Sequence, residues 1–158
     1  MKTLKWGLIG CGDIAHRRIG PAFSELKSCE LRAVSRQHAS ELKRCVAHLG
    51  AKRGYGDWKT LLLDNTIDAV YIATPVHLHS EQTIAAAESG KHVLCEKPMA
   101  MNTVECERMI SACNRNNVQL GVAYYRRFYP VVELMKSIIA TGEIGRVVLI
   151  QIDASETP

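Results

Sequence analysis

Short apolar runs of strand length alternate with longer segments of helical period along this 158-residue chain. The runs predicted to be strands are Leu4–Ile9, Leu31–Ser35, Asp68–Thr74, His92–Glu96 and Val118–Tyr124, with a weaker one near Arg53–Tyr55. The clearest helices predicted between them are Ala39–Leu49, Ser80–Ser89 and Asn102–Asn116. Because parallel strands need a crossover segment between them, this alternation predicts an α/β fold, a doubly wound parallel sheet with helices on both faces.

Residues typical of helix ends support these bounds. Gly50 and Gly90 follow the first two of these helices, where a helix often ends in a left-handed residue. Asn102 opens the third, with a glutamate three residues on, which is a variant of the capping box. The first helix of the chain is less regular, because the Gly20-Pro21 pair falls within it, and we expect a break there.

Composition and charge exclude several classes of protein. Hydrophobic residues make up 47% of the chain and charged residues 23%, as in an ordinary globular domain. No stretch reaches the roughly 18 apolar residues of a membrane span, and the N-terminus does not read as a signal peptide, so we expect a cytoplasmic protein without a membrane partner. The net charge of +4 is scattered, which suits an anionic small ligand, and we predict no nucleic-acid partner.

Cysteine and histidine spacing argues against cross-links and metals. The six cysteines form no CxxC pair, and several lie within apolar runs, so they are predicted to be free buried thiols. His77 and His79 are close in sequence, but no cysteine or carboxylate stands at a matching spacing. We therefore predict neither disulfides nor a metal site.

The segment GLIGCGDIAH follows the first predicted strand and opens the first helix. Gly10 allows a tight turn, Gly12 lets the backbone approach a pyrophosphate, and Ala15 keeps helix and strand close. Amides at the helix N-terminus would face the phosphates. Such turns also occur without a nucleotide, but this position between strand and helix favours a dinucleotide site in a fold of Rossmann type.

The end of the second strand predicts which dinucleotide binds. An Asp or Glu there would accept from the ribose hydroxyls of NAD(H), but this chain has Ser35 and Arg36. A hydroxyl and a guanidinium can hold a 2′-phosphate, which a carboxylate would repel. The pair favours NADP(H) over NAD(H). The alternative is that Arg36 is a solvated loop cation.

Two more loops follow predicted strands at the carboxyl edge of the sheet, where ligands bind in open α/β folds. Pro75 ends one strand, so the residues from Thr74 to His79 should form a loop. The alternative for His77 and His79 is that they start a helix and make only local hydrogen bonds.

The segment CEKP ends the next strand, beside that loop. Glu96 can accept from ribose hydroxyls or pair with a cation. Lys97 would point into the cleft, where an ammonium can bind a substrate oxygen and assist proton transfer. Pro98 fixes the turn, with a cis bond after Lys97 as one uncommon geometry. The alternative is an exposed Glu–Lys pair, which contributes little to stability.

The end of the chain predicts a second domain. Val131–Thr141 is predicted to be a helix, and Val147–Asp153 a strand with no later partner in the sequence. An unpaired apolar strand is a liability that complete proteins usually cover. We therefore expect a Rossmann domain over residues 1–123, followed over residues 124–158 by the crossover helix and first strand of a truncated α/β domain for substrate binding and oligomerisation.

Five segments in one order carry a family resemblance. They are GCGDIA, YGDWKTLLLDNTIDAVYIATPVHLH, GKHVLCEKPMA, GVAYYRRFYP and TGEIGRVV. Together they resemble the glucose–fructose oxidoreductase / inositol dehydrogenase (Gfo/Idh/MocA) family of nicotinamide-dependent oxidoreductases. The match runs from about Leu4 to Ile150.

The resemblance implies roles for individual residues. The phosphate turn would consist of Gly10, Gly12, Asp13 and Ile14, and Ser35 and Arg36 would face the adenosine ribose. The nicotinamide side would be lined by Thr74, Pro75 and His79, with Glu96 at the nicotinamide ribose. Arg127 would lie near the cofactor cleft. Lys97 matches the catalytic-site lysine of the family. Val76 departs from the pattern, because the family commonly has Asn there and one polar contact to cofactor is lost.

The function implied is hydride transfer between NADP(H) and a sugar, polyol or related hydroxy or keto compound. The family's second domain supplies an Asp and a His that complete the site with the lysine, and no residue of this chain matches them. Whether this chain alone is an enzyme therefore stays open. One alternative is a non-catalytic dinucleotide-binding module. A second alternative is glycoside cleavage with bound NAD, which some members of the family catalyse. A homo-oligomer is expected if the second domain is present.

Overall fold

The computed structural model describes residues 3–153. The chain divides into two compact units, residues 1–123 and residues 124–158, and each is described by itself. Within the described part of the chain, no helix is long and apolar enough to span a membrane.

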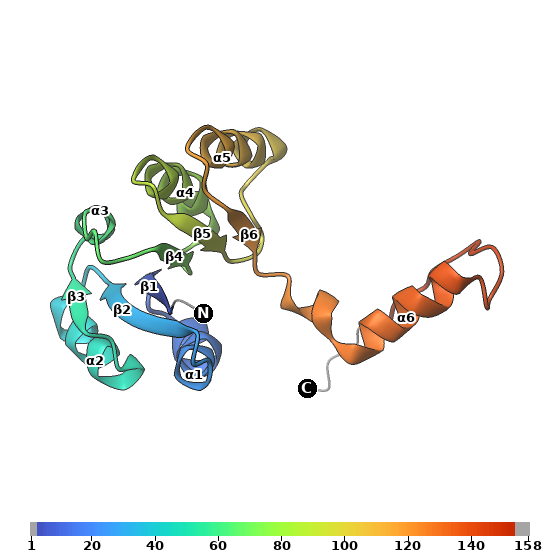
Figure 1. Ribbon diagram of the computed structural model, residues 1–158, viewed down its shortest axis with the longest axis horizontal. Helices are drawn as coiled ribbons and strands as arrows, with labels where there is room; N and C mark the ends of the chain where they lie inside the picture. Colours follow the sequence, from blue (N-terminus) through green and yellow to red (C-terminus); the bar gives the residue numbers. More distant parts are fainter. Residues whose placement is uncertain (1–2, 154–158) are drawn as a thin grey trace. The chain divides into compact units, whose positions relative to one another are not determined.

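The first unit is built on one parallel sheet (Figure 1). Its strands are β1 (Leu4–Ile9), β2 (Cys29–Ser35), β3 (Arg53–Tyr55), β4 (Ala69–Ile72), β5 (His92–Cys95) and β6 (Leu120–Val122). They lie in the order β3-β2-β1-β4-β5-β6, and every neighbouring pair is parallel. The chain moves outward from β1 in one direction and then from β4 in the other. This order places a topological switch point between β1 and β4, and the predicted doubly wound sheet is confirmed.

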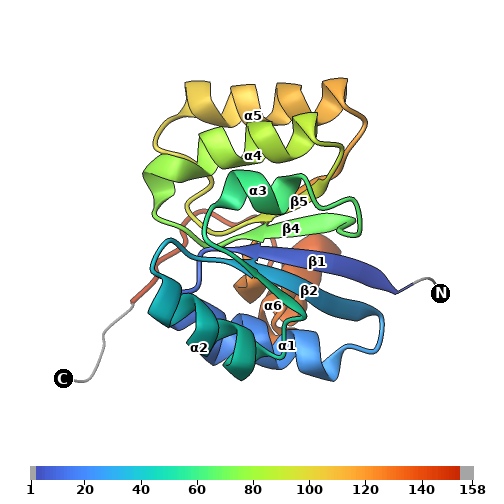
Figure 2. The ribbon, with the colours of Figure 1, turned by 90° about the vertical axis from the view of Figure 1, so that its left-hand side faces the viewer.

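Helices cover both faces of this sheet (Figure 2). They are α1 (Gly20–Glu25), α2 (Ala39–Leu49), α3 (Trp58–Leu62), α4 (His79–Glu88) and α5 (Thr103–Arg115), with a π-helical turn at Ala15–Ile19 and a 3-10 turn at Val76–Leu78. In Figure 2, α1 and α2 lie below the sheet, and α3, α4 and α5 lie above it.

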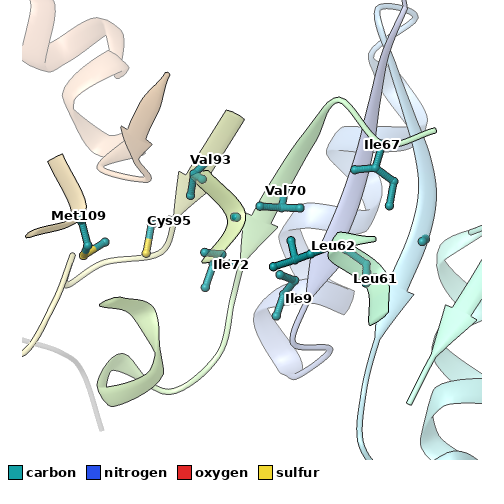
Figure 3. Close-up of a cluster of buried hydrophobic side chains, with 11 residues drawn as sticks. Ile9, Leu61, Leu62, Ile67, Val70, Ile72, Val93, Cys95 and Met109 are labelled. Carbon is teal, nitrogen blue, oxygen red and sulfur yellow. The ribbon is translucent and has the colours of Figure 1, made fainter. Parts of the chain in front are cut away.

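The strands are apolar on both sides because both sides are covered. Leu8 of β1 packs into the cluster beneath α1 and α2, whereas its neighbour Ile9 packs into the cluster beneath α3, α4 and α5 (Figure 3). Ala33 and Val34 of β2 divide between the two clusters in the same way. Burying a side chain of the size of Leu8 stabilises the fold by about 1.5–3 kcal/mol. The near-continuous hydrophobic runs of the sequence thus come from a sheet with no solvent-facing side.

Most predicted helix ends are observed. Gly50 ends α2 with φ 65° and Gly90 follows α4 with φ 71°, both in the left-handed region. The Asn102 side chain accepts from the amide of Glu105 at 3.0 Å. The returning carboxylate of Glu105 accepts from the amide of Met101 at 3.1 Å rather than from that of Asn102, which makes this a shifted capping box.

The first helix differs from its prediction, because the chain stays helical through the Gly20-Pro21 pair. A π-helical turn ends there and α1 begins, with Gly20 at φ −56° and ψ −54°. Pro21 stands in the first turn of α1, where its fixed φ suits a helix. The expected break is therefore a change of hydrogen-bonding pattern and not an interruption.

Helix α3 was not among the predicted elements. It has only five residues, too few for a hydrophobic period to stand out. Asp57 caps it by accepting from the amide of Lys59 at 3.2 Å.

In the second unit, a 3-10 turn at Tyr125–Phe128 precedes α6 (Pro130–Thr141), one residue longer than predicted. The strand predicted at Val147–Asp153 is absent, and these residues have no regular structure. A strand exists only when another backbone accepts and donates its hydrogen bonds, and among the described residues no strand pairs with this segment. Residues 154–158, which follow this segment, lie outside the described residues.

Candidate dinucleotide-binding cleft

A cleft of about 410 Å³ opens at the carboxyl ends of β1, β2 and β4. It is lined by three loop segments, Ile9 to Gly12, Ser35 to His38 and Ala73 to Pro75, and by the single residues Trp58, Leu78 and Gln82. The amide of Ala73 donates to the Ile9 carbonyl at 2.8 Å, and the amide of Gly10 donates to the Ser35 carbonyl at 3.2 Å. These two bonds hold three loops together at the switch point of the sheet.

The glycine turn shows why each of its positions is small. Gly10 has φ 91°, and a Cβ built on it would lie 2.7 Å from the carbonyl oxygen of Ala73. At Gly12 a built Cβ meets no protein atom within 4 Å, so the backbone there borders open space. Ala15 is fully buried against the β1 cluster. The turn therefore has no room for a side chain at Gly10 and open space beside Gly12, which is what a backbone needs if it is to approach a pyrophosphate.

Asp13 and Ile14 complete the turn. Asp13 is exposed, and Ile14 is half-buried at the cap of the π-helical turn, where it packs against the Leu8 cluster. Neither side chain lines the cleft among the described residues. Their predicted contact with a dinucleotide stays a prediction.

Cys11 separates the two glycines and is buried, with 3% of its surface exposed. Burial, followed by the adjacent Cys45 thiol, raises the pKa of the Cys11 thiol above its usual range. The thiol is therefore uncharged near neutral pH and does not repel a phosphate at this turn.

Ser35 and Arg36 line the cleft at the carboxyl end of β2, and their predicted contact with the adenosine ribose stays a prediction. The Arg36 guanidinium donates to a carboxylate oxygen of Glu41 and to the carbonyl oxygen of Cys11. The hydrogen bond with Glu41 raises the pKa of Arg36, and the same bond lowers the pKa of Glu41. Arg36 is thus a fixed member of the cleft wall and not a solvated loop cation.

Side chains of α4 contact the loop that contains Thr74. The Thr74 hydroxyl donates to Gln82 at 2.6 Å, and Pro75 is exposed at the rim. His79 is 1% exposed and does not line the cleft among the described residues. Its Nε2 lies 2.8 Å from the Thr74 carbonyl oxygen and its Nδ1 lies 3.0 Å from that of Pro98. The structure gives His79 a positioning role that joins two loops, where the sequence predicted a lining residue.

Glu96 and Lys97 follow β5 with opposite exposures. Glu96 is buried, accepts from the Tyr71 hydroxyl at 2.9 Å and from the Lys97 amide at 3.1 Å. Lys97 is exposed, and its peptide bond to Pro98 is cis. The pair is therefore not a surface ion pair. Glu96 is a fixed acceptor within the fold, and the Lys97 ammonium faces solvent.

Arg127 belongs to the second unit, on the 3-10 turn Tyr125–Phe128. Its guanidinium carbon lies 5.5 Å from the centroid of the Phe128 ring. Its predicted place near the cofactor stays a prediction.

Sequence reasoning missed several lining residues: Gln37, His38, Trp58, Leu78 and Gln82. Gln37 and His38 follow directly on Ser35-Arg36, and their place at a strand end was a usable signal. Trp58 and Gln82 come from helices, and only the packing of α3 and α4 onto the sheet brings them to this edge.

Comparison with known proteins agrees with this geometry. The model of the family described as "Oxidoreductase family, NAD-binding Rossmann fold" matches residues 4–124. Oxidoreductase P35 of Formosa agariphila is 35% identical over 98% of this chain and 48% of its own length. The scyllo-inositol 2-dehydrogenase (NADP(+)) IolU of Bacillus subtilis is 36% identical over 90% of this chain and 44% of its own length.

The solved structures give the same result. The WlbA dehydrogenase of Bordetella pertussis, in complex with NADH and UDP-GlcNAcA, matches 92% of this chain and 44% of its own chain, with a TM-score of 0.85 and 33% identity. The chain thus spans about half the length of the curated relatives it matches. Because of its strand order, its glycine turn and these matches, the chain belongs to the Gfo/Idh/MocA family of oxidoreductases, and its residues 4–124 form the family's NAD(P)-binding Rossmann domain.

Proposed function

We propose that the protein binds NADP(H) in this cleft and takes part in hydride transfer to or from a hydroxyl-bearing carbon of a sugar or polyol. The observation that carries the binding proposal is the turn itself, where Gly10 admits no side chain and Gly12 borders open space. Relatives named for sugar and inositol substrates support the substrate class.

The preference for NADP(H) rests on the charge of the lining. The described residues that line the cleft include an arginine and a serine but no Asp or Glu. A carboxylate is the usual acceptor for the ribose 2′-hydroxyl of NAD(H), whereas Arg36 and Ser35 offer donors to a 2′-phosphate. Glu41 reduces this preference, because it already pairs with Arg36.

Bound in the cleft, the nicotinamide would supply the hydride donor or acceptor. Glu96 would accept from a ribose hydroxyl, and the Tyr71 hydroxyl and the Lys97 amide already orient its carboxylate. The exposed Lys97 ammonium would bind the oxygen on the reacting carbon and favour the development of negative charge there.

The test is Lys97→Ala, with Lys27→Ala as a matched control in an exposed loop. NADPH binding is measured by fluorescence titration, and turnover by reduction of NADP⁺ with a panel of sugars and polyols. We expect Lys97→Ala to abolish turnover and leave the Kd for NADPH unchanged, and the control to alter neither. Unchanged kcat in Lys97→Ala would remove the lysine from the mechanism. Binding of NADPH by the unaltered protein with no turnover on any substrate would favour the non-catalytic module.

A further inference from the structure

Three potential metal ligands gather beneath the glycine turn. Cys11 lies in the turn, His16 in the π-helical turn that follows, and Cys45 in α2. The two sulfurs and one imidazole nitrogen all lie within 4.8 Å of one another. Cys11 and Cys45 are buried, with 3% and 2% of their surfaces exposed, and His16 is half-buried.

The distances among these atoms suit a tetrahedral zinc ion. With zinc bonds of ordinary length, a sulfur and a nitrogen ligand lie about 3.5 Å apart, and two sulfurs about 3.8 Å apart. The Cys45 sulfur lies 3.5 Å from Nε2 of His16. The remaining ligand pairs, at 4.8 Å or less, need to close by no more than about 1.3 Å, which side-chain rotation can supply.

The cluster also has an access route. Cys11, His16 and Cys45 line a solvent-open cavity of about 770 Å³, whose wall includes Glu41 and His48. An ion can therefore enter from solvent, and water can occupy a position that the protein leaves open.

Neighbouring groups hold the ligands in place. The His48 ring packs edge-on against the His16 ring, with centroids 4.9 Å apart. The Cys45 thiol points at the Cys11 carbonyl oxygen at 3.8 Å, and Arg36 donates to that same oxygen. These contacts fix the His16 ring and the Cys11 backbone before an ion binds, and the thiol hydrogen bond of Cys45 ends when its proton leaves.

We propose that Cys11, His16 and Cys45 bind a zinc ion through two thiolates and one imidazole, with the fourth position open to the cavity. Each thiol releases its proton to solvent when the ion binds. The two thiolate charges balance the charge of the ion, so the buried site is neutral. Two thiolates with one imidazole and an open position are a recurrent zinc ligand set. This proposal departs from the sequence-based prediction of no metal, which considered only close spacings.

Two readings compete with a metal site. The thiols could serve only as small apolar side chains of the core, or they could form a disulfide. A disulfide needs the sulfurs about 2.05 Å apart and excludes metal binding. The first reading predicts that the reduced protein binds no zinc. The second predicts that the unreduced protein has no free thiol at Cys11 or Cys45 and binds zinc only after reduction.

The experiment titrates Zn²⁺ into metal-stripped, phosphine-reduced protein against a chromophoric chelator. We expect one zinc ion per chain. Co²⁺ should give the visible and thiolate charge-transfer bands of a tetrahedral site. Cys45→Ser should weaken zinc binding by about 100-fold or more, since even the loss of a partner to a ligand costs roughly 10–100-fold. His16→Gln gives a second test at a half-buried position.

Cys106→Ser is the matched control, because Cys106 is a half-buried thiol outside the cluster, and it should bind zinc normally. Circular dichroism of each variant checks that it is folded. Absence of stoichiometric zinc binding would overturn the proposal, as would equal zinc affinity in Cys45→Ser and Cys106→Ser. Selective binding of Cu(I) without Zn²⁺ would overturn the zinc assignment. The readout is the metal, so this result is independent of NADP(H) binding and of turnover.

Discussion

Nε2 of His79 lies 2.8 Å from the carbonyl oxygen of Thr74, so a buried side chain of α4 supports the loop that forms one wall of the cleft. The other ring nitrogen lies 3.0 Å from the carbonyl oxygen of Pro98, in the turn that presents Lys97. A single imidazole thus connects the dinucleotide cleft to the proposed catalytic lysine.

Replacing this imidazole should destabilise the fold and loosen both loops. His79→Ala removes a side chain that is 1% exposed together with its contacts to two carbonyls. We expect the free energy of unfolding to fall by about 2–4 kcal/mol in urea denaturation. NADPH binding should weaken in the folded variant. His77→Ala, at an exposed position two residues earlier, should stay within about 0.5 kcal/mol of the unaltered protein. Equal stability of the two variants would contradict the joining role.

Substitution of the two glycines of the turn should have different effects, on stability at Gly10 and on NADPH binding at Gly12. Gly10→Ala places a methyl group 2.7 Å from a backbone oxygen at a positive φ, so we expect a loss of stability of at least about 2 kcal/mol by thermal or urea unfolding. Gly12→Ala meets no protein atom and should fold normally. Its methyl group would occupy the space proposed for the pyrophosphate, and titration should show NADPH binding weakened by about tenfold or more. Normal NADPH affinity in Gly12→Ala would place the dinucleotide elsewhere.

Cofactor preference should follow the charge at the end of β2. We expect NADPH to bind more tightly than NADH, and Arg36→Asp to reverse the order with a loss of about 10- to 100-fold in NADPH affinity. Arg115→Asp makes the same charge change on an exposed residue of α5 and should leave the order intact. If the unaltered protein binds both cofactors equally, the 2′-phosphate interpretation of Ser35 and Arg36 is wrong.

Glu41 offers a test in the opposite direction. Its carboxylate accepts from the Arg36 guanidinium that the 2′-phosphate would use. Glu41→Gln removes the competing charge, and NADPH affinity should rise several-fold, on the order of 0.5–1 kcal/mol. NADH affinity should change little, because NADH has no 2′-phosphate. Titrations of both cofactors at equal ionic strength would check this, and a loss of NADPH affinity would show that Glu41 positions Arg36 rather than competing for it.

Asp64 should make the fold sensitive to acid. Burial alone would raise its pKa, but hydrogen bonds from the Thr66 hydroxyl and amide and from the Tyr55 hydroxyl outweigh it and hold the pKa at about 2. Because the folded pKa lies below the unfolded one, the stabilisation is complete above about pH 4 and is lost as pH falls toward 2.

The contribution of Asp64 is about 2 kcal/mol. Asp64→Asn should be less stable than the unaltered protein at neutral pH, and the difference should shrink as the pH is lowered through that window. Urea unfolding at several pH values measures both. A difference that stays constant with pH would mean that Asp64 is not the titrating group.

The sequence predicted well what depends on neighbouring residues. The bounds of β1, β3 and α2 agree with the observed ones, since apolar period and end-capping residues act within a few positions. The glycine turn was equally visible, because its tight geometry depends on its own residues. Where a partner had to come from elsewhere, as at Val147–Asp153, the same local pattern predicted a strand that is absent.

Tertiary structure alone decided which distant residues meet. The order of strands brings Gly10 against Ala73 and Thr74, and the packing of α2 on β2 brings Glu41 to Arg36 and Cys45 to Cys11. No local propensity encodes these contacts, because they depend on how whole elements stack over the sheet. The sequence by itself therefore determined a Rossmann domain with a dinucleotide turn. The pairing of Arg36, the burial of His79 and the thiol–imidazole cluster followed only from the packing of helices on both faces.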